Sequence, residues 1–178
     1  ALSNPHQGVM AEVEPLTWLH LEDYVEQNTD NMCLVLLDQL TNSQNIGSIL
    51  RTASAFNVDG VVITKNNTPM ENGLMARAAA GAIETMPLIR VTNLSRSIEY
   101  LKKNNFFVIG LEKHGKENIS DCIGNPQTAL VLGSENLGLR RLTKEKLSTS
   151  AKIPIAVQTE SLNVSNATAI ALYVIQNS

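Results

Sequence analysis

The chain has 178 residues, of which 43% are hydrophobic and 17% charged, and its formal net charge is −3. This length is typical of one domain, and so high an apolar fraction with so small a net charge excludes intrinsic disorder. No apolar run approaches the roughly 18–20 residues that a membrane-spanning helix needs, and the two cysteines cannot form a disulfide framework. We therefore expect a cytoplasmic protein. The acidic balance excludes a strongly basic protein that coats nucleic acid but permits an enzyme with a local RNA-binding patch.

The first 31 residues differ from the rest of the chain. Asn4, Pro5 and Gly8 are typical of a linker. Pro15 then precedes a short stretch with leucines at helical spacing. We expect a linker and a leading helix over residues 1–31, followed by one catalytic domain over residues 32–178.

From residue 32 onward, strand patterns alternate with helix patterns. Short apolar runs predict strands over 32–37, 60–64, 87–91, 106–111, 129–132 and 153–157. Apolar residues at helical spacing predict helices over 46–56, 74–82, 94–103, 139–147 and 164–176. Pro154 favours an edge or irregular position for the last strand. This alternation predicts an α/β fold, with a mostly parallel sheet and helices on both faces.

Polar and glycine-rich segments follow the predicted strands, and the carboxyl ends of parallel strands are where such sheets bind ligands. Gly110, Gly133 and Gly138 would allow the backbone to approach a nucleotide-like ligand closely. The dinucleotide and P-loop glycine motifs are absent, and no residues have metal-ligand spacing, so we expect no metal site. The polar groups on this rim are Asn45, Arg51, Glu135, Ser161 and Asn163.

Each of these residues also has a simpler interpretation. Asn45 alone is typical of a helix cap, and Glu135 could be a loop carboxylate that faces water. Arg51, six residues from Asn45, lies on another helical face and could be a solvated surface residue. Ser161 and Asn163 could be no more than the start of the last helix. A basic cluster at Arg140, Arg141, Lys144 and Lys146 is by default a solvated face, with RNA contact as the alternative.

Three separated motifs resemble those of the SpoU family of S-adenosylmethionine-dependent RNA ribose 2′-O-methyltransferases. They are Asn45-Ile-Gly-Ser-Ile-Leu-Arg-Thr-Ala53, Leu130-Val-Leu-Gly-Ser-Glu-Asn-Leu-Gly138, and Ile153-Pro-Ile155 with Ser161-Leu-Asn-Val-Ser165. The resemblance extends over residues 4–176. Residues 87–94 and 139–144 are similar to the branch that methylates a guanosine of large-subunit ribosomal RNA. Residues 6–8 resemble the junction that follows a small N-terminal RNA-binding module in that branch, and we expect this module to be absent here.

The resemblance implies a C-terminal trefoil knot and a homodimer whose active site lies at the subunit interface. The alanines of residues 76–80, with Ala167, Ala169 and Ala171, would permit close helix approach. The implied cofactor is S-adenosylmethionine. The positions implied for its binding are Leu111, Gly133, Ser134, Ile153, Ile155 and Leu162. The catalytic positions that the resemblance implies are Asn45, Arg51, Glu135, Ser161 and Asn163.

The implied reaction is in-line methyl transfer to a ribose 2′-hydroxyl. A sulfonium departs as a neutral thioether, so the difficulty is the proton of the weakly acidic hydroxyl. The family proposal makes the equivalent of Arg51 the base, yet a guanidinium is better suited to clamp a phosphate and stabilise negative charge. Ser161, Asn163 or water would then carry the proton. One departure from the family is Asn136, where glycine is frequent, and asparagine tolerates the left-handed backbone better than most residues.

Two alternatives remain beside ribosomal RNA methylation. The substrate could be transfer RNA, because the family acts on both classes. The chain could also be a catalytically idle RNA-binding or dimerisation module of the same fold. An idle module would be expected to have lost Arg51, Glu135 or Asn163, and all three are present.

Overall fold

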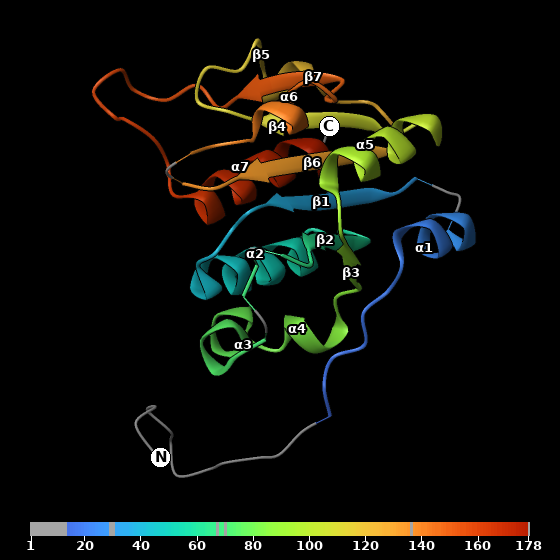
Figure 1. The fold of residues 1–178 in the computed structure, drawn as a ribbon. Coiled ribbons are helices and arrows are strands. Elements are labelled where there is room, and N and C mark those ends of the chain that lie inside the picture. The colour runs from blue at the N-terminus through green and yellow to red at the C-terminus, as the bar shows by residue number, and fades with distance from the viewer. Residues whose placement is uncertain (1–13, 29–30, 67, 70, 136, 178) are drawn as a thin grey trace.

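A parallel β-sheet forms the centre of the molecule (Figure 1). The computed structural model describes residues 14–28, 31–66, 68–69, 71–135 and 137–177. Within these residues the sheet has seven strands in the order β3-β2-β1-β6-β4-β7-β5, and every pairing is parallel. The strands are β1 (Cys33–Asp38), β2 (Gly60–Thr64), β3 (Leu88–Val91), β4 (Phe107–Leu111), β5 (Glu117–Asn118), β6 (Thr128–Gly133) and β7 (Thr149–Lys152). The predicted parallel α/β fold is confirmed.

Helices cover both faces of this sheet. Between the sheet and the helices on each face lies a separate apolar cluster. They are α1 (Leu21–Gln27), α2 (Ser43–Ala55), α3 (Gly73–Ala79), α4 (Ala82–Thr85), α5 (Leu94–Lys103), α6 (Arg141–Lys144) and α7 (Val164–Gln176), with a short 3₁₀ helix, η1 (Ile119–Asp121). Buried residues of α2, α3, α4 and α7 belong to one cluster, and those of α1 and α5 to the other. None of the helices within the described residues is long and apolar enough to cross a membrane.

The central strands have no exposed face, as their continuous apolar runs predicted. All six residues of β1 are buried, and β1 lies between β2 and β6. Its register places Asp38 beside Gly133, so β1 and β6 end together. Because β1 and β6 end at the same level, the loops that follow them lie together at the carboxyl ends of the strands (Figure 1).

Three predicted elements differ from the structure. The strand expected over 153–157 is wrong: β7 lies just before it, at Thr149–Lys152, and residues 153–156 have no regular structure. The expected strand contains Pro154, which has no N–H to donate to a ladder. The helix expected over 74–82 is divided into α3 and α4 by Ala80, at φ 49°, and Gly81, at φ 90°. The charged helix expected over 139–147 is shorter, at Arg141–Lys144.

The leading segment packs onto the sheet. Leu19 forms a parallel bridge with β3, in which its N–H donates to the carbonyl of Leu88 at 2.9 Å. The indole N–H of Trp18 donates to Glu71 at 3.0 Å, and the guanidinium of Arg90 lies 3.8 Å from the centre of the Trp18 ring. This segment therefore covers the edge of β3 that would otherwise be open to pairing. Residues 1–13 lie outside the described part, and both the domain division and the trefoil knot stay predictions.

Candidate active site

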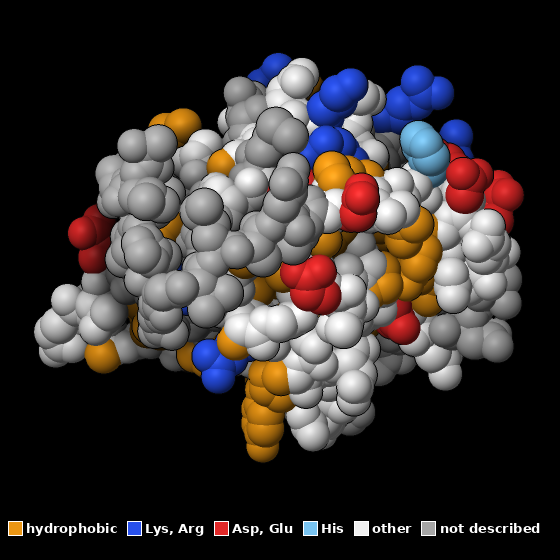
Figure 2. Space-filling view, turned by 90° about the horizontal axis from the view of Figure 1, so that it is seen from below, with side chains coloured by type: hydrophobic (Ala, Val, Ile, Leu, Met, Phe, Trp, Pro, Cys, Tyr) orange, Lys and Arg blue, Asp and Glu red, His pale blue; other side chains and the backbone are white. Residues whose placement is uncertain are grey.

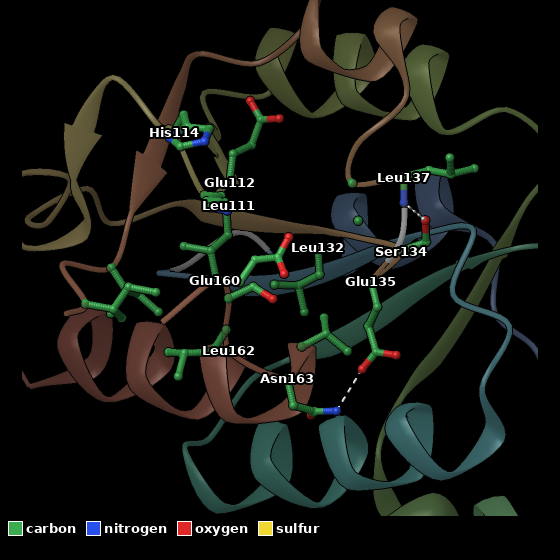
Figure 3. A pocket seen from close by; sticks show the side chains of 18 of the residues that line it. Leu111, Glu112, His114, Leu132, Ser134, Glu135, Leu137, Glu160, Leu162 and Asn163 are labelled. Carbon is green, nitrogen blue, oxygen red and sulfur yellow. Dashed lines mark hydrogen bonds between the residues drawn. The ribbon is translucent and has the colours of Figure 1, made fainter. Parts of the chain in front are cut away.

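A cavity of about 640 Å³ opens at the carboxyl ends of β4 and β6, a size typical of ligand sites (Figure 3). The segment between β7 and α7 and the first turn of α7 form its other wall. The six residues that the sequence suggested for cofactor binding, which are Leu111, Gly133, Ser134, Ile153, Ile155 and Leu162, all line it. Four of these side chains are aliphatic, so part of the wall is apolar. The charged or titratable residues that line the cavity are Glu112, Lys113, His114, Glu135, Lys144 and Glu160.

A carboxylate held by two amides lies at the mouth of this cavity. The side-chain amide of Asn45, in the first turn of α2, donates to Glu135 Oε1 at 2.8 Å. The side-chain amide of Asn163, at the start of α7, donates to the same oxygen at 2.7 Å and to Asn45 Oδ1 at 3.3 Å. Glu135 and Asn163 are exposed to solvent, and Asn45 is half-buried. The structure thus brings together three of the five predicted catalytic residues, from three segments far apart in the sequence.

The two asparagines differ in their relation to the helices. Asn163 caps α7, because its Oδ1 accepts from the Ser165 N–H at 2.9 Å, and it also holds Glu135. The cap interpretation of Asn163 is therefore confirmed, and its catalytic role stays a prediction. Asn45 is not a cap: Asn42 caps α2, accepting from the backbone N–H of Gln44 and of Asn45. The side chain of Asn45 is consequently free to bind Glu135.

The other two predicted catalytic residues lie apart from this cluster. Ser161 lines the cavity, but within the described residues no hydrogen bond joins it to Glu135. Arg51 is exposed on α2 and is not among the residues lining the cavity. Six helical residues separate it from Asn45, which rotates its side chain to another face and moves it about 9 Å along the axis. No described residue is a hydrogen-bond or ion-pair partner of Arg51.

Gly133 is required by the packing of the chain on itself. A Cβ atom built on Gly133 would lie 2.3 Å from the carbonyl carbon of Gly138 and 2.4 Å from the backbone nitrogen of Leu139. Gly138 has a φ of 64°, and its N–H donates to the Ser134 carbonyl at 2.8 Å. These glycines let the chain turn back tightly behind β6, so ligand approach is not needed to explain them. Asn136 lies in this turn but outside the described residues.

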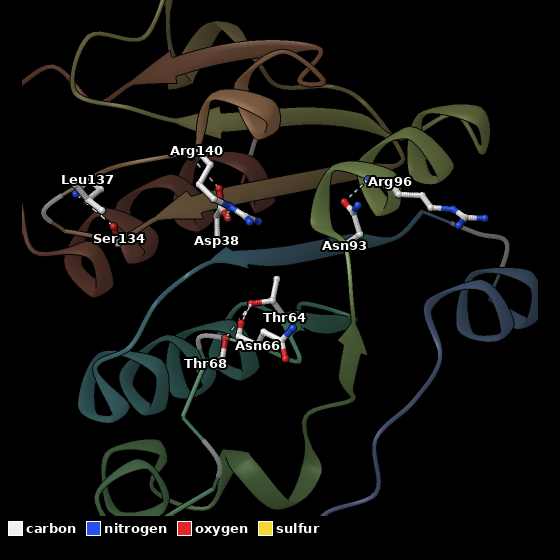
Figure 4. Close-up of polar contacts among 9 residues, drawn as sticks. All are labelled: Asp38, Thr64, Asn66, Thr68, Asn93, Arg96, Ser134, Leu137 and Arg140. Atoms are coloured by element: carbon white, nitrogen blue, oxygen red, sulfur yellow. Dashed lines mark hydrogen bonds and ion pairs between the residues drawn. The ribbon is translucent and has the colours of Figure 1, made fainter.

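An ion pair behind the turn was not foreseen from the sequence. Asp38 is fully buried at the end of β1, and its Oδ1 accepts from Arg140 Nε at 2.6 Å while its Oδ2 accepts from the Arg140 backbone N–H at 3.0 Å (Figure 4). The Leu137 N–H donates to Ser134 Oγ at 3.3 Å in the same turn. A carboxylate that ends an otherwise apolar, buried strand requires a partner, and this was the available signal. The pair fixes the turn that carries Glu135 against β1.

The predicted basic cluster is largely neutralised. Besides Arg140, Lys144 pairs with Glu112 at 2.5 Å, and Arg141 and Lys146 pair with Glu145 and Glu99 at the same distance. The hydrogen bond between Lys146 and Glu99 lowers the pKa of the carboxyl and raises the pKa of the amine. Figure 2 shows that lysine and arginine side chains gather at one edge of the face seen there, with carboxylates spread beside and below them. All four cations of the cluster are therefore paired with carboxylates, and contact of this surface with RNA stays a prediction.

A parallel sheet with a ligand-sized cavity at the carboxyl ends of its strands is the arrangement of an α/β ligand-binding protein. Residues 32–173 match the model of the SpoU rRNA Methylase family. The putative TrmH family tRNA/rRNA methyltransferase YacO of Bacillus subtilis (strain 168) is 37% identical over 175 residues, which are 97% of this chain and 70% of that protein. A putative TrmH family methyltransferase of Staphylococcus aureus (strain COL) is 38% identical over 172 residues, 95% of this chain and 69% of that protein. The chain belongs to the SpoU rRNA methylase family.

Solved structures agree with this assignment. The SpoU methyltransferase AviRb from Streptomyces viridochromogenes, crystallised in complex with the cofactor AdoMet, superposes with a TM-score of 0.76 and 25% identity. That alignment covers 82% of this chain and 57% of the AviRb chain, so this chain spans less than two thirds of it. An rRNA methyltransferase from Sinorhizobium meliloti with bound AdoMet has the same TM-score at 24% identity, covering 89% of this chain and 60% of that one. It supports the fold.

Proposed function

We propose that this protein transfers a methyl group from S-adenosylmethionine to a ribose 2′-hydroxyl of RNA, with a guanosine of large-subunit ribosomal RNA as the target, in the cytoplasm. One observation carries the proposal. All six residues that the motifs assign to the cofactor line one cavity, and the amide-held carboxylate of Glu135 lies at its mouth. Family membership and the AdoMet complex of AviRb support the choice of cofactor.

The lining of the cavity fits this cofactor. Leu111, Ile153 and Leu162 provide apolar wall against which an adenine ring would pack. Three carboxylates line the cavity against two lysines, so the charge around it is slightly negative and suits a cationic ligand. The bound cofactor would supply an electrophilic methyl group on a sulfonium. The protein would orient the ribose and accept the proton of its hydroxyl.

We also propose that the active form is a homodimer that contacts its partner through α7. Ala79 and Ala171 are fully buried within their own chain, so these alanines pack internally. The exposed apolar residues of α7 are instead Ile170, 40% exposed, and Tyr173, 60% exposed. A site completed by a second subunit would account for the absence of Arg51 from the lining of the cavity in one chain. Arg51 would then clamp the phosphate beside the target ribose.

Cofactor binding is the first measurement to make. Calorimetric titration of S-adenosylmethionine should show one site per chain. Ile155→Arg should abolish binding, because Ile155 lines the cavity. Val157→Arg is the matched control, since Val157 lies two residues away and is 99% exposed. A folded wild-type protein that binds no cofactor would overturn the methyltransferase proposal and favour the idle module.

The position of methylation can then be read chemically. Unmodified large-subunit ribosomal RNA and transfer RNA transcripts are incubated with the protein and S-adenosylmethionine labelled in the methyl group. Alkali cleaves RNA through the free 2′-hydroxyl, so a 2′-O-methylated guanosine should survive in a labelled dinucleotide. Label in transfer RNA alone would replace ribosomal RNA as the substrate. Label that alkali releases as mononucleotides would exclude 2′-O methylation.

A further inference from the structure

The two carboxylate oxygens of Glu135 differ in their hydrogen bonds. Both amide donors, from Asn45 and Asn163, bind Oε1, at 2.8 and 2.7 Å. Oε2 has no hydrogen-bond partner among the residues that the structure describes. Figure 3 shows one carboxylate oxygen joined to Asn163 and the other turned away from it. Two hydrogen bonds to Oε1 therefore fix the carboxylate, and no described residue occupies the lone pairs of Oε2.

Ser165 determines which way the Asn163 amide faces. Ser165 Oγ donates to Asn163 Oδ1 at 2.6 Å, and the Ser165 N–H donates to the same oxygen at 2.9 Å. With both acceptor sites of Oδ1 filled, the NH₂ end of the amide must point to Glu135. A flipped amide would place its oxygen against the carboxylate and leave the helix terminus uncapped. Ser165 thus fixes Glu135 through Asn163 without touching it.

Few groups at the cavity can accept a proton from a hydroxyl. A guanidinium and the side-chain amides are not bases at neutral pH. Glu112 is held through Oε1 by the cation of Lys144, which favours the charged carboxylate over a protonated one. Glu160 and His114 line the cavity, but both are exposed, and no described residue hydrogen-bonds either side chain to fix it. A general base must be held within hydrogen-bond reach of the proton it takes. Among the described carboxylates that line the cavity, Glu135 is the one that neutral amides hold and no cation pairs with.

On the assumption that the proposed function is correct, we propose that Glu135 Oε2 accepts the proton of the attacking 2′-hydroxyl, and that Ser165 positions it through Asn163. As the ribose oxygen forms its bond to the methyl carbon, the carbon–sulfur bond breaks and its electron pair stays on the sulfur. The O–H bond breaks in the same step, and the proton passes to Oε2 and then to water. Glu135 is the catalytic residue, and Ser165 is a positioning residue.

The test measures single-turnover methylation against pH, with ribosomal RNA transcript and saturating S-adenosylmethionine. The wild-type rate should fall at acid pH, because a protonated Glu135 cannot accept the proton. Glu135→Gln should lose about 10²–10⁴-fold in rate and should lose this acid limb, while its calorimetric cofactor affinity stays within about twofold. Glu160→Gln, the same change in the same cavity, and His114→Asn should both keep the acid limb.

The outcomes separate the two proposals. An inactive wild-type protein would overturn the proposed function and the assignment that rests on it. An active wild type whose Glu135→Gln variant keeps its acid limb would overturn the role of Glu135 alone. If Glu160→Gln or His114→Asn abolished the fall in rate at acid pH, the role of Glu135 would also be overturned.

The positioning role of Ser165 has its own readout. Ser165→Ala should slow single-turnover methylation about fivefold, the effect of one lost hydrogen bond, and Ser165→Thr should restore it. Combination with Asn163→Ala should add nothing to the loss from Asn163→Ala itself, because Ser165 acts only through that amide. Additive losses, or failure of Ser165→Thr to restore the rate, would overturn the relay.

Discussion

Gly133 packs tightly against the backbone of residues 138–139, and this contact makes a specific prediction. The backbone of residues 138–139 leaves no space for a Cβ, so Gly133→Ala should lower the free energy of unfolding by about 2 kcal/mol or more. Urea unfolding measures the change. Gly73→Ala is the control, because a Cβ at Gly73 meets nothing within 4 Å. Equal stability of the two variants would show that the contact between Gly133 and residues 138–139 has room for a Cβ.

The two cysteines should be unreactive in the folded protein. Burial, with a smaller effect from the charge of Asp59, raises the pKa of Cys33 to about 12. Burial and the hydrogen bond to Glu117 raise the pKa of Cys122 to about 12. Because thiolates are the reactive form, iodoacetamide at pH 8 should modify neither in native protein and both in guanidinium. Rapid alkylation of the native protein at pH 8 would contradict this prediction.

The raised pKa values of the two cysteines also make the free energy of unfolding depend on pH. The unfolded thiols ionise near their ordinary value of 9.0 and the folded thiols near 12. Their contribution to stability is therefore complete below about pH 9 and is lost as the pH rises from 9 to 12. Urea unfolding at pH 8 and pH 10 should show a larger loss for wild type than for the Cys33→Ser, Cys122→Ser double variant.

The residues of the site could be predicted from the sequence more easily than their arrangement. The motifs identified the six cavity residues and the Asn45–Glu135–Asn163 cluster. They could not show that Asn42 caps α2 and so leaves Asn45 free, because several polar residues in a row can each cap. The Asp38–Arg140 pair joins residues 102 positions apart, and only the register of β1 brings them together.

At the scale of elements, the exposed face of α7 predicts the oligomeric state. Ile170 and Tyr173 are both exposed on this helix, and the Tyr173 ring contacts Phe56 edge-on. The Ile170→Glu, Tyr173→Glu double variant should sediment as a monomer under conditions where the wild type is a dimer, because burying two carboxylates is costly. Leu74→Glu is the control, because Leu74 is an exposed apolar residue on another helix, α3. A variant that keeps the wild-type dimer mass would move the interface elsewhere.

The elements also show where sequence patterns carry too little information. The apolar runs of β1 and β2 are unambiguous, and both strands lie where expected. The sequence of β7, Thr-Ser-Ala-Lys, has one buried residue and no apolar run, so its pairing with β4 had no local signal. The break between α3 and α4 depends on a left-handed Ala80, a conformation that alanine rarely adopts.

At the scale of the whole molecule, charge predicts weak binding to RNA. The net charge is −3, and four cations of the basic cluster are already paired. The protein is titrated with ribosomal RNA transcript at several salt concentrations. A plot of the logarithm of the binding constant against the logarithm of the salt concentration should have a slope no steeper than about −3, as expected for few phosphate contacts. Arg141→Ala should leave the slope unchanged, because Glu145 already neutralises this arginine. A tight complex at physiological salt would contradict the prediction.

The contacts of Asn163 determine when in folding the site is completed. Its amide binds Asn45, 118 positions earlier, and Glu135, 28 positions earlier, and its own orientation depends on the first turn of α7. A chain that stops before α7 contains Glu135 and Asn45 but lacks Asn163, the second amide that holds the carboxylate. The carboxylate is therefore held by both amides only after α7 has docked against the strand ends and α2.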